Sequence, residues 1–316
     1  MSANHDRTGS LRILQWNCRS LPRRKSELLV HIKDYKFDIL LLQETRTNDI
    51  ELSGYLKFSN PSIKRQNLAT AHIRPGEWEV RAQVNLFVSK NLPCIQLDTS
   101  QWCLDSQEIT AVRIALHATK RRLVVASAYT CPGRQWNFEW ITHLKNEYPD
   151  DYLILGGDPN TKLEDWNINQ LNQKTRRLLE ITEHNELELV NDTTKPTRHA
   201  TASNQTDSII DVTLATPATA RKLSWDTMRD AWGSDHFPII IDAAIGSNNL
   251  KPKRPTQTII WDKFRENLEE QREDLQPHQV TALLTAATHL ATEVREVRDD
   301  TPEPDYHLLA LWDKRT

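Results

Sequence analysis

Short apolar runs, each bounded by turn residues, recur along most of this 316-residue chain. Runs of this length and composition predict buried strands, and helical periodicity is confined to fewer segments. The predicted strands are 11–16, 37–44, 84–88, 109–116, 123–129, 152–155, 187–190, 209–214, 223–229 and 237–244. Many strands with few helices between them predict packed sheets flanked by helices, rather than a purely doubly wound fold.

Helical periodicity and a change in residue composition define the predicted domains. Before residue 245, helical spacing of apolar residues is found at 23–35, 138–147 and 173–184. Residues 246–257 are polar and rich in Lys and Pro, which predicts a linker. From Val280 to Val297 the apolar residues again keep a helical stripe that needs a partner. We expect a disordered N-terminus over 1–10, a main domain over 11–245 and a helical appendage over 258–316.

Composition narrows the class of protein without deciding its function. A hydrophobic content of 38% and a charged content of 26% are typical of a soluble globular protein. No run of about 18 apolar residues is present, so we expect no membrane segment. The four cysteines show no metal-ligand spacing, which favours reduced thiols inside a cell. The net charge of −3 does not point to nucleic acid, but it does not exclude a local basic face.

Polar side chains end several of the predicted strands. Asn17 ends the first strand, Glu44 the second, and Tyr129 a later one. In YLILGGDPNT, residues 152–161, an acid and an amide (Asp158 and Asn160) stand two residues apart. If the chain stays extended there, both side chains point to the same face. Each such residue alone is more often a turn former or a solvated side chain.

The segment SIIDVTL carries a carboxylate that is harder to explain as surface. Asp211 stands among apolar residues, where a charged group is costly unless it is paired. A histidine or a cation would be its natural partner. Ser234, Asp235 and His236 precede the last predicted strand in GSDHFPI, and they supply a histidine.

Taken together and in this order, the segments LQWN, LLQET, SAYTCPG, GGDPN, SIIDVTL and GSDHFPI resemble the endonuclease/exonuclease/phosphatase superfamily. More narrowly, they are similar to the apurinic-endonuclease-like domain of non-LTR (LINE-type) retrotransposon polyproteins. The resemblance covers roughly residues 11–244. It implies an α+β four-layer sandwich of two packed mixed β-sheets flanked by helices. The segments IIWDKFRENLEE and PDYHLLALWDKRT resemble the helical connector that leads into a reverse transcriptase. The resemblance implies that this chain is truncated before the reverse transcriptase, which would be its partner in a longer polyprotein.

The resemblance also implies a role for each strand-end residue. Asp158 would orient or deprotonate the attacking water, Glu44 would be the principal magnesium ligand, and Asp211 would pair with His236. The implied catalytic residues are Asp158, His236, Asp211, Tyr129 and Asn160, the implied metal ligands are Glu44, Asn17 and Asp235, and the implied phosphate contacts are Asn160, Tyr129, Thr197 and Ser234. Hydrolysis of an anionic phosphodiester needs charge neutralisation and an aligned water, which these residue types supply.

The resulting hypothesis is a DNA endonuclease that uses Mg²⁺, with Mn²⁺ as an alternative, and nicks target DNA during retrotransposon integration in the nucleus. Basic groups at 23–25, 64–65 and 120–122 are candidate contacts to the DNA backbone. Two alternatives stay open: a phosphatase of the same superfamily, and a catalytically weakened relic that binds nucleic acid. Pro159 stands where relatives usually carry Phe, which favours a weakened copy. The sequence leaves the oligomeric state open.

Overall fold

The computed structural model describes residues 10–60, 82–116, 121–162, 172–201, 206–245, 255–259, 261–270 and 280–296. The chain divides into two compact units, Met1–Leu250 and Lys251–Thr316. Several predicted features lie wholly or largely outside the described residues: the N-terminus, most of the linker, the end of the appendage, the basic group at 64–65 and Lys120.

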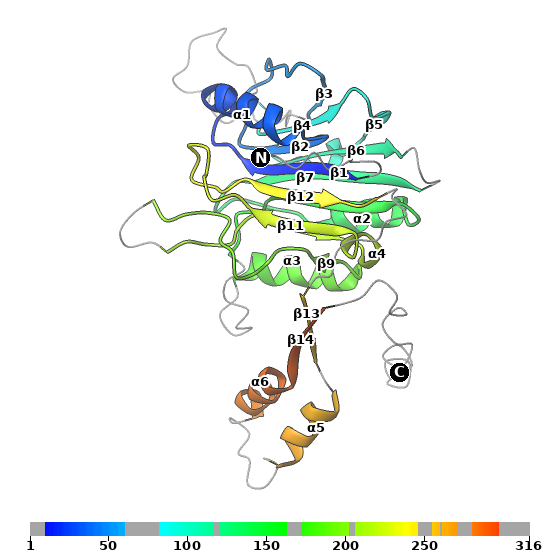
Figure 1. Ribbon diagram of the computed structural model, residues 1–316, viewed down its shortest axis with the longest axis vertical. Coiled ribbons are helices and arrows are strands. Elements are labelled where there is room, and N and C mark those ends of the chain that lie inside the picture. Colours follow the sequence, from blue (N-terminus) through cyan, green and yellow to red (C-terminus); the bar gives the residue numbers. More distant parts are fainter. Residues whose placement is uncertain are drawn as a thin grey trace. The chain divides into compact units, whose positions relative to one another are not determined.

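The first unit contains two six-stranded mixed sheets (Figure 1). In spatial order, the first sheet consists of β11 (Leu223–Thr227), β12 (Ile239–Ala243), β1 (Leu11–Asn17), β2 (Ile39–Gln43), β4 (Val84–Ser89) and β3 (Tyr55–Phe58). The second consists of β5 (Cys94–Leu97), β6 (Gln107–Ala115), β7 (Arg122–Thr130), β8 (Tyr152–Asp158), β10 (Val212–Ala215) and β9 (Glu188–Leu189). The pairs β1–β2 and β7–β8 are parallel, and the other described pairs are antiparallel.

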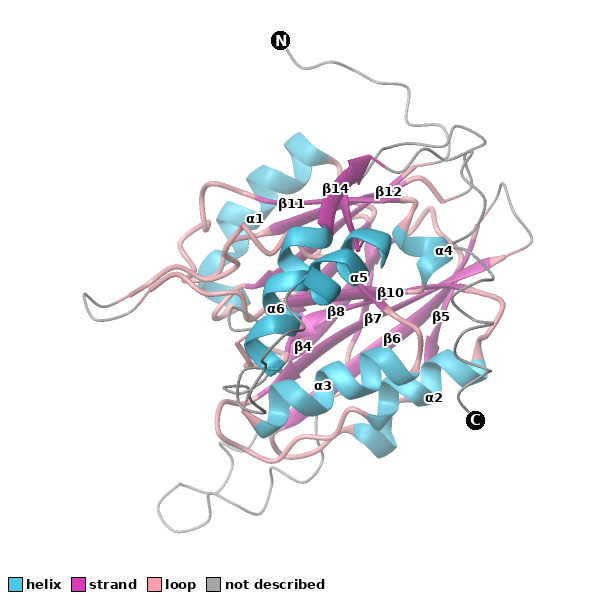
Figure 2. Ribbon diagram, turned by 90° about the horizontal axis from the view of Figure 1, so that it is seen from below, coloured by secondary structure: helices cyan, strands magenta, loops and turns pink. Residues whose placement is uncertain are grey.

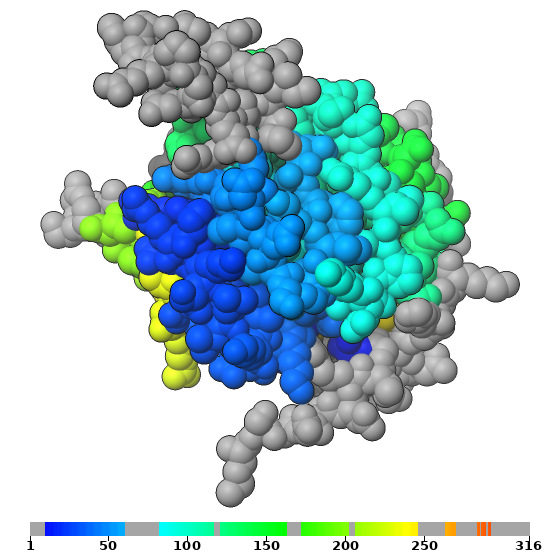
Figure 3. Space-filling view, turned by 90° about the horizontal axis from the view of Figure 1, so that it is seen from above, coloured from blue at the N-terminus to red at the C-terminus, as the bar shows by residue number. Residues whose placement is uncertain are grey.

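Helices cover the outer faces of both sheets, which gives the four predicted layers (Figure 2). The helix α1 (Leu21–Tyr35) packs on the first sheet, and α2 (Glu139–Glu147) and α3 (Gln173–His184) pack on the second. In Figure 3, the blue part of the chain, which includes α1, and the cyan part, which begins at residue 82, lie side by side on one face of this unit. A single turn, α4 (Pro217–Ala220), joins β10 to β11, and a short 3-10 turn, η2 (Ser100–Trp102), precedes β6.

The central strands are mostly apolar because both of their faces are buried. In β2, Leu41 lies in the core between the sheets, whereas Leu40 lies in the core under α1. In β8, Ile154 belongs to the core between the sheets and Leu155 to the core under α2 and α3. Alternation along each strand therefore fills three hydrophobic layers instead of separating a wet face from a dry one.

Two buried glutamines connect the sheets. Gln15 of β1 donates to the carbonyl of Val212 and accepts from Thr213 at 2.8 Å, both on the opposite sheet. Gln43 of β2 donates to the Ser127 hydroxyl of β7 at 2.9 Å. A Cβ at Gly156 would lie only 2.4 Å from the Gln15 side chain, so this glycine makes room for the link.

Several elements differ from the sequence prediction. The strands β3 and β5 were not predicted, because both are short and partly exposed and lack a clear apolar pattern. The strand predicted from residue 209 begins at Val212, so Asp211 precedes the strand instead of interrupting it. Strand β8 runs on to Asp158 itself.

The second unit contains α5 (Trp261–Glu270), α6 (Val280–Ala291) and an antiparallel pair of strands, β13 (Pro255–Ile259) and β14 (Thr292–Glu296). The predicted helical stripe therefore ends at Ala291, and Val294 lies in a strand opposite Gln257. The strands were not expected because their alternating polar residues lack an apolar face. Ala287 and Ala291 of α6 are buried.

Candidate active site

Four of the predicted site residues lie at one edge of the sandwich because two parallel strand pairs end there. Asn17 closes β1 and lies in register with Gln43, the residue before Glu44. Tyr129 of β7 lies in register with Asp158, the last residue of β8. Since parallel strands place their carboxyl ends at the same edge, these side chains meet although the sequence separates them widely.

The Asn17 amide joins these four residues in one network. Its Nδ2 donates to Asp158 Oδ2 at 2.8 Å and to Glu44 Oε1 at 3.3 Å. The Tyr129 hydroxyl donates to the same Glu44 oxygen at 3.2 Å. One amide hydrogen-bonded to two carboxylates holds the acids close together at the junction of the two sheets.

The tip after β8 turns instead of staying extended, which corrects the expectation for Asp158 and Asn160. Asn160 has a φ of 49°, in the left-handed region that Asn tolerates better than most residues. Its backbone N–H donates to Asp158 Oδ1 at 2.8 Å, as in an Asx turn. Its side-chain amide donates to the Thr130 carbonyl at 2.9 Å and to Asp158 Oδ2 at 3.3 Å. The acid and the amide therefore meet through a turn.

Asp211 and His236 form the predicted pair. Asp211 Oδ2 lies 2.8 Å from His236 Nδ1, and both residues are buried. The other ring nitrogen, Nε2, lies 3.9 Å from Asp158 Oδ2. The Trp16 indole donates to the His236 carbonyl at 3.1 Å and fixes the backbone of this loop. The imidazole is thus held between two carboxylates.

Burial and these neighbours shift the titration of the site. Burial raises the pKa of Asp158 to about 7. The charge of Asp211 also raises this pKa, whereas the charge of His236 lowers it. Burial lowers the pKa of His236, but the Asp211 carboxylate and its hydrogen bond outweigh that effect and raise it to about 9. Burial and the charge of Glu44 raise the pKa of Tyr129 far above its ordinary value. At neutral pH the histidine is protonated, the tyrosine is neutral, and Asp158 is near its midpoint.

Two residues predicted to contact phosphate support the backbone of the site. Thr197 is fully buried, and its hydroxyl accepts the backbone N–H groups of Ile210 and Asp211 at 3.1 and 3.0 Å. The Ser234 hydroxyl donates to the Asn17 carbonyl at 2.8 Å. These bonds place Asp211 and the loop before His236, so both residues act on the site through its backbone.

Arginines that the sequence analysis did not single out surround the acids. Arg198 binds Asp235 through Nε at 3.2 Å and Nη2 at 3.1 Å, and Arg19 lies 3.8 Å from the same carboxylate. The Arg46 guanidinium forms an ion pair with Glu44. Arg46 stands only two residues after Glu44, a spacing that could have identified it. The partners of Asp235 lie far away in sequence and had no such signal.

Among the described residues, Asp158, Asp211 and His236 form an acidic group compact enough to hold a metal ion, with ligand atoms within 4.8 Å of one another. A histidine must be neutral to bind a metal, whereas His236 is held protonated by Asp211. Glu44 suits a hard cation better, because its carboxylate is partly exposed, but the Arg46 guanidinium that pairs with it would have to move to admit the ion. The predicted ligand Asp235 is engaged by Arg198.

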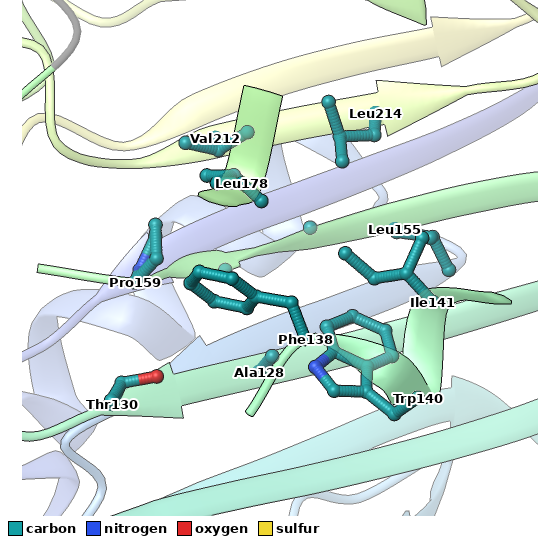
Figure 4. A pocket seen from close by; sticks show the side chains of 12 residues that line it. Ala128, Thr130, Phe138, Trp140, Ile141, Leu155, Pro159, Leu178, Val212 and Leu214 are labelled. Atoms are coloured by element: carbon teal, nitrogen blue, oxygen red, sulfur yellow. The ribbon is translucent and has the colours of Figure 1, made fainter. Parts of the chain in front are cut away.

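Pro159 points away from this network, into the layer under α2 and α3. It lines a cavity of about 30 Å³ together with Phe138, Leu178 and Val212 (Figure 4). The lining is mostly apolar, so the space next to the strand tip is a packing defect.

The predicted basic groups that the structure describes lie in different parts of the fold. Arg23, Arg24 and Lys25 lie in the first turns of α1. Arg122 begins β7, whereas Tyr129 lies near the other end of that strand, so this group does not border the site. Among the described residues, the helices are too short or too polar to cross a membrane.

Comparison with known proteins shows what this chain is similar to. Residues 123–240 match the endonuclease-reverse transcriptase family. The RNA-directed DNA polymerase from the mobile element jockey of Drosophila melanogaster is 24% identical over 249 residues. That alignment covers 78% of this chain, and the chain spans about a quarter of the relative's length, 25%.

Solved structures agree in fold. The endonuclease domain of TRAS1, a telomere-specific non-LTR retrotransposon, matches with a TM-score of 0.57 and 20% identity, over 75% of this chain and 100% of that domain. AP endonuclease LMAP from Leishmania major matches with a TM-score of 0.53 and 14% identity, over 77% and 90% of the chains. The APE2 catalytic domain from Xenopus laevis matches with a TM-score of 0.52 and 15% identity, over 76% and 95%.

The chain therefore has the same fold as the TRAS1 endonuclease domain and the two AP-endonuclease-type proteins. The chain is similar to the endonuclease domain of a non-LTR retrotransposon and to a mobile-element polymerase, as its motifs predicted.

Proposed function

We propose that this protein is a divalent-metal-dependent DNA endonuclease that nicks a target strand. The observation that carries the proposal is the position of Asp158, whose Oδ2 lies 2.8 Å from the Asn17 amide and 3.9 Å from the imidazole of the Asp211–His236 pair. One network thus contains the Asp158 carboxylate, which can accept a proton from water, a cationic imidazole, and the Glu44 carboxylate, which is the proposed metal ligand.

Each residue has a role that suits its environment. Asp158, with a pKa of about 7, accepts the proton of the attacking water near neutral pH. His236 stays protonated against Asp211 and donates to a non-bridging phosphate oxygen, where negative charge develops. Tyr129 stays neutral, and its hydroxyl donates a hydrogen bond to the scissile phosphate. Glu44 would hold a divalent metal ion, Mg²⁺ or Mn²⁺, which would supply positive charge to neutralise the phosphate and the leaving oxygen.

The narrower assignments follow from the relatives. The jockey protein is an RNA-directed DNA polymerase, and we propose that the present unit likewise works within a longer polyprotein that contains a reverse transcriptase. Such a protein would act on DNA in the nucleus. We also propose that residues 11–245 form the nuclease domain and that residues 258–316 form a connector.

Nicking of supercoiled plasmid tests the proposal directly. We expect relaxed circles with Mg²⁺, none with EDTA, and loss of nicking in Glu44→Gln, Asp158→Asn and His236→Gln. Asp226→Asn is the matched control, because it neutralises an exposed carboxylate that pairs with Lys195. Cleavage that persists in EDTA or in Asp158→Asn would contradict the proposal. Faster release of phosphate from inositol phosphates than nicking of DNA would favour a phosphatase.

A further inference from the structure

We propose that Arg46 is an exchangeable counter-ion of Glu44: its guanidinium occupies the outer oxygen of this carboxylate in the metal-free protein and leaves it when a divalent cation binds. This inference rests on the proposed function, in which Glu44 holds the metal ion. It adds a residue that sets how tightly the site binds metal, a role that no motif indicated.

The two oxygens of the Glu44 carboxylate have different surroundings. Oε1 accepts a hydrogen bond from the Asn17 amide at 3.3 Å and another from the Tyr129 hydroxyl at 3.2 Å, so it belongs to the interior network. Oε2 is paired with the Arg46 guanidinium. Because Oε1 is already engaged from within, a cation that arrives from solvent would take Oε2. Arg46 therefore holds the oxygen that the metal ion needs.

Arg46 can leave this oxygen while Glu44 stays in place. The Arg46 side chain is 51% exposed, whereas that of Glu44 is 16% exposed. The backbone between them is fixed at Thr45, whose N–H donates to the Gln83 carbonyl at 3.1 Å and whose hydroxyl donates to the Ala82 carbonyl at 3.0 Å. A half-exposed guanidinium on a fixed backbone can rotate into solvent without a change in the fold.

A guanidinium and a divalent cation cannot share one carboxylate oxygen, because their positive charges repel each other at that distance. Mg²⁺ is usually bound through only one or two carboxylates, so an arginine on one of them blocks much of the ligand set. Asp235, another predicted ligand, is likewise paired with an arginine, Arg198. The free energy of the Glu44–Arg46 pair is therefore lost when metal binds, and metal binding is weaker by that amount.

Binding of Mn²⁺ to the DNA-free protein tests this inference. The dissociation constant would be measured from the EPR signal of free Mn²⁺ at constant pH and salt. We expect Arg46→Met to bind Mn²⁺ about fivefold more tightly than the wild type, which is the factor that a good exposed ion pair contributes. Arg46→Lys keeps the charge beside Glu44 and should stay within about twofold of the wild type.

Two further variants separate competition for Glu44 from a general change of charge. Arg19→Met removes a similarly exposed charge that lies 3.8 Å from Asp235, and it leaves the Glu44–Arg46 pair intact. Its Mn²⁺ affinity should therefore change much less. Both arginine side chains are more than half exposed, so neither substitution should unfold the protein. Glu44→Gln should lose Mn²⁺ binding, and adding Arg46→Met to it should not restore binding.

Three results would overturn the inference. The first is a wild-type dissociation constant in Arg46→Met, and the second is an equal gain of affinity in Arg19→Met. The third is a gain that persists when Arg46→Met is combined with Glu44→Gln, because the arginine would then act on another metal site.

The same proteins distinguish this inference from the proposed function, because Mn²⁺ binding is measured without DNA. If Arg46→Met tightens binding but the wild type does not nick plasmid, the counter-ion role stands and the nuclease proposal fails. If the wild type nicks plasmid with Mn²⁺ and Arg46→Met binds Mn²⁺ as the wild type does, the nuclease proposal stands and the role of Arg46 is wrong. Absence of any Mn²⁺ binding that Glu44→Gln removes would contradict both.

Discussion

The Asn17 amide donates a 2.8 Å hydrogen bond to Asp158, and the two residues end strands of different sheets. The site therefore exists only when the sandwich is closed. Gln15 and Gln43 make further contacts between the same sheets deeper in the core. Any substitution that lets the two sheets shift relative to each other should displace Asp158 from Asn17 before it unfolds the protein.

Removing the carboxylate of Asp211 should change the pH dependence of nicking. Asp211 is the main cause of the raised pKa of His236, so in Asp211→Asn that pKa falls and the imidazole loses its proton at lower pH. We expect a loss of about 100-fold at pH 8, partly regained near pH 6. The measurement is a pH–rate profile for the wild type, Asp211→Asn and the exposed control Asp207→Asn. An unshifted alkaline limb in Asp211→Asn would contradict the pairing argument.

Asp158→Asn should be inactive yet more stable. The folded-state pKa of Asp158 is raised from 3.8 to about 7, so its favourable contribution is complete below pH 4 and is lost as pH rises through 7. His236, raised from 6.5 to about 9, loses its contribution between those values. Because Asn stays neutral, we expect its Tm to exceed that of the wild type by about 3–6 °C at pH 8. A lower Tm at pH 8 would show that the carboxylate stabilises the fold.

Pro159→Phe should raise stability and nicking rate together. A phenyl ring can fill the cavity of about 30 Å³ beside Phe138 and Leu178, which should stabilise the fold by about 1–3 kcal/mol. A tip displaced by about 1 Å can lower the rate on the order of 100-fold, because alignment of the water is geometric. Both quantities are measured on the two purified proteins. An unchanged or lower rate in the Phe variant would mean that Pro159 does not weaken this site, and the interpretation of a weakened copy would be wrong.

Gly157→Ala should be strongly destabilising. A Cβ at this position would lie 2.1 Å from the Ala128 carbonyl oxygen, where β8 meets β7. We expect a loss above about 3 kcal/mol in urea unfolding, because backbone must move. Gly133→Ala is the control: it has a φ of 61° but no atom within 4 Å, and it should cost only about 1 kcal/mol. Similar losses in both variants would refute the steric explanation.

Residues 1–246 should nick DNA without the remainder of the chain. The first compact unit ends at Leu250, and the inferred site residues all lie before it. Plasmid nicking and Tm of the shortened protein, compared with the full chain, test this prediction. An insoluble or inactive product beside an active full chain would show that the second unit completes the first.

Much of the fold was predictable because its signals are local. Fully buried strands such as ILLLQ, Ile39–Gln43, need apolar side chains on both faces, and that requirement is visible in the sequence. The edge strands β3 and β5 escaped prediction because an edge strand tolerates polar residues on its open side. Asn160 was predicted on the right face for the wrong reason, since a turn and not an extended chain brings it to Asp158.

The sequence alone determined which residue types stand at the strand ends, and the burial cost of Asp211 showed that it needed a partner. Tertiary structure decided what those residues contact. The Thr197 and Ser234 hydroxyls bind backbone groups, and Asp235 pairs with Arg198. The reason is physical: burial and local conformation depend on neighbours in sequence, whereas charge pairing depends on distances between strands that only the closed sandwich sets.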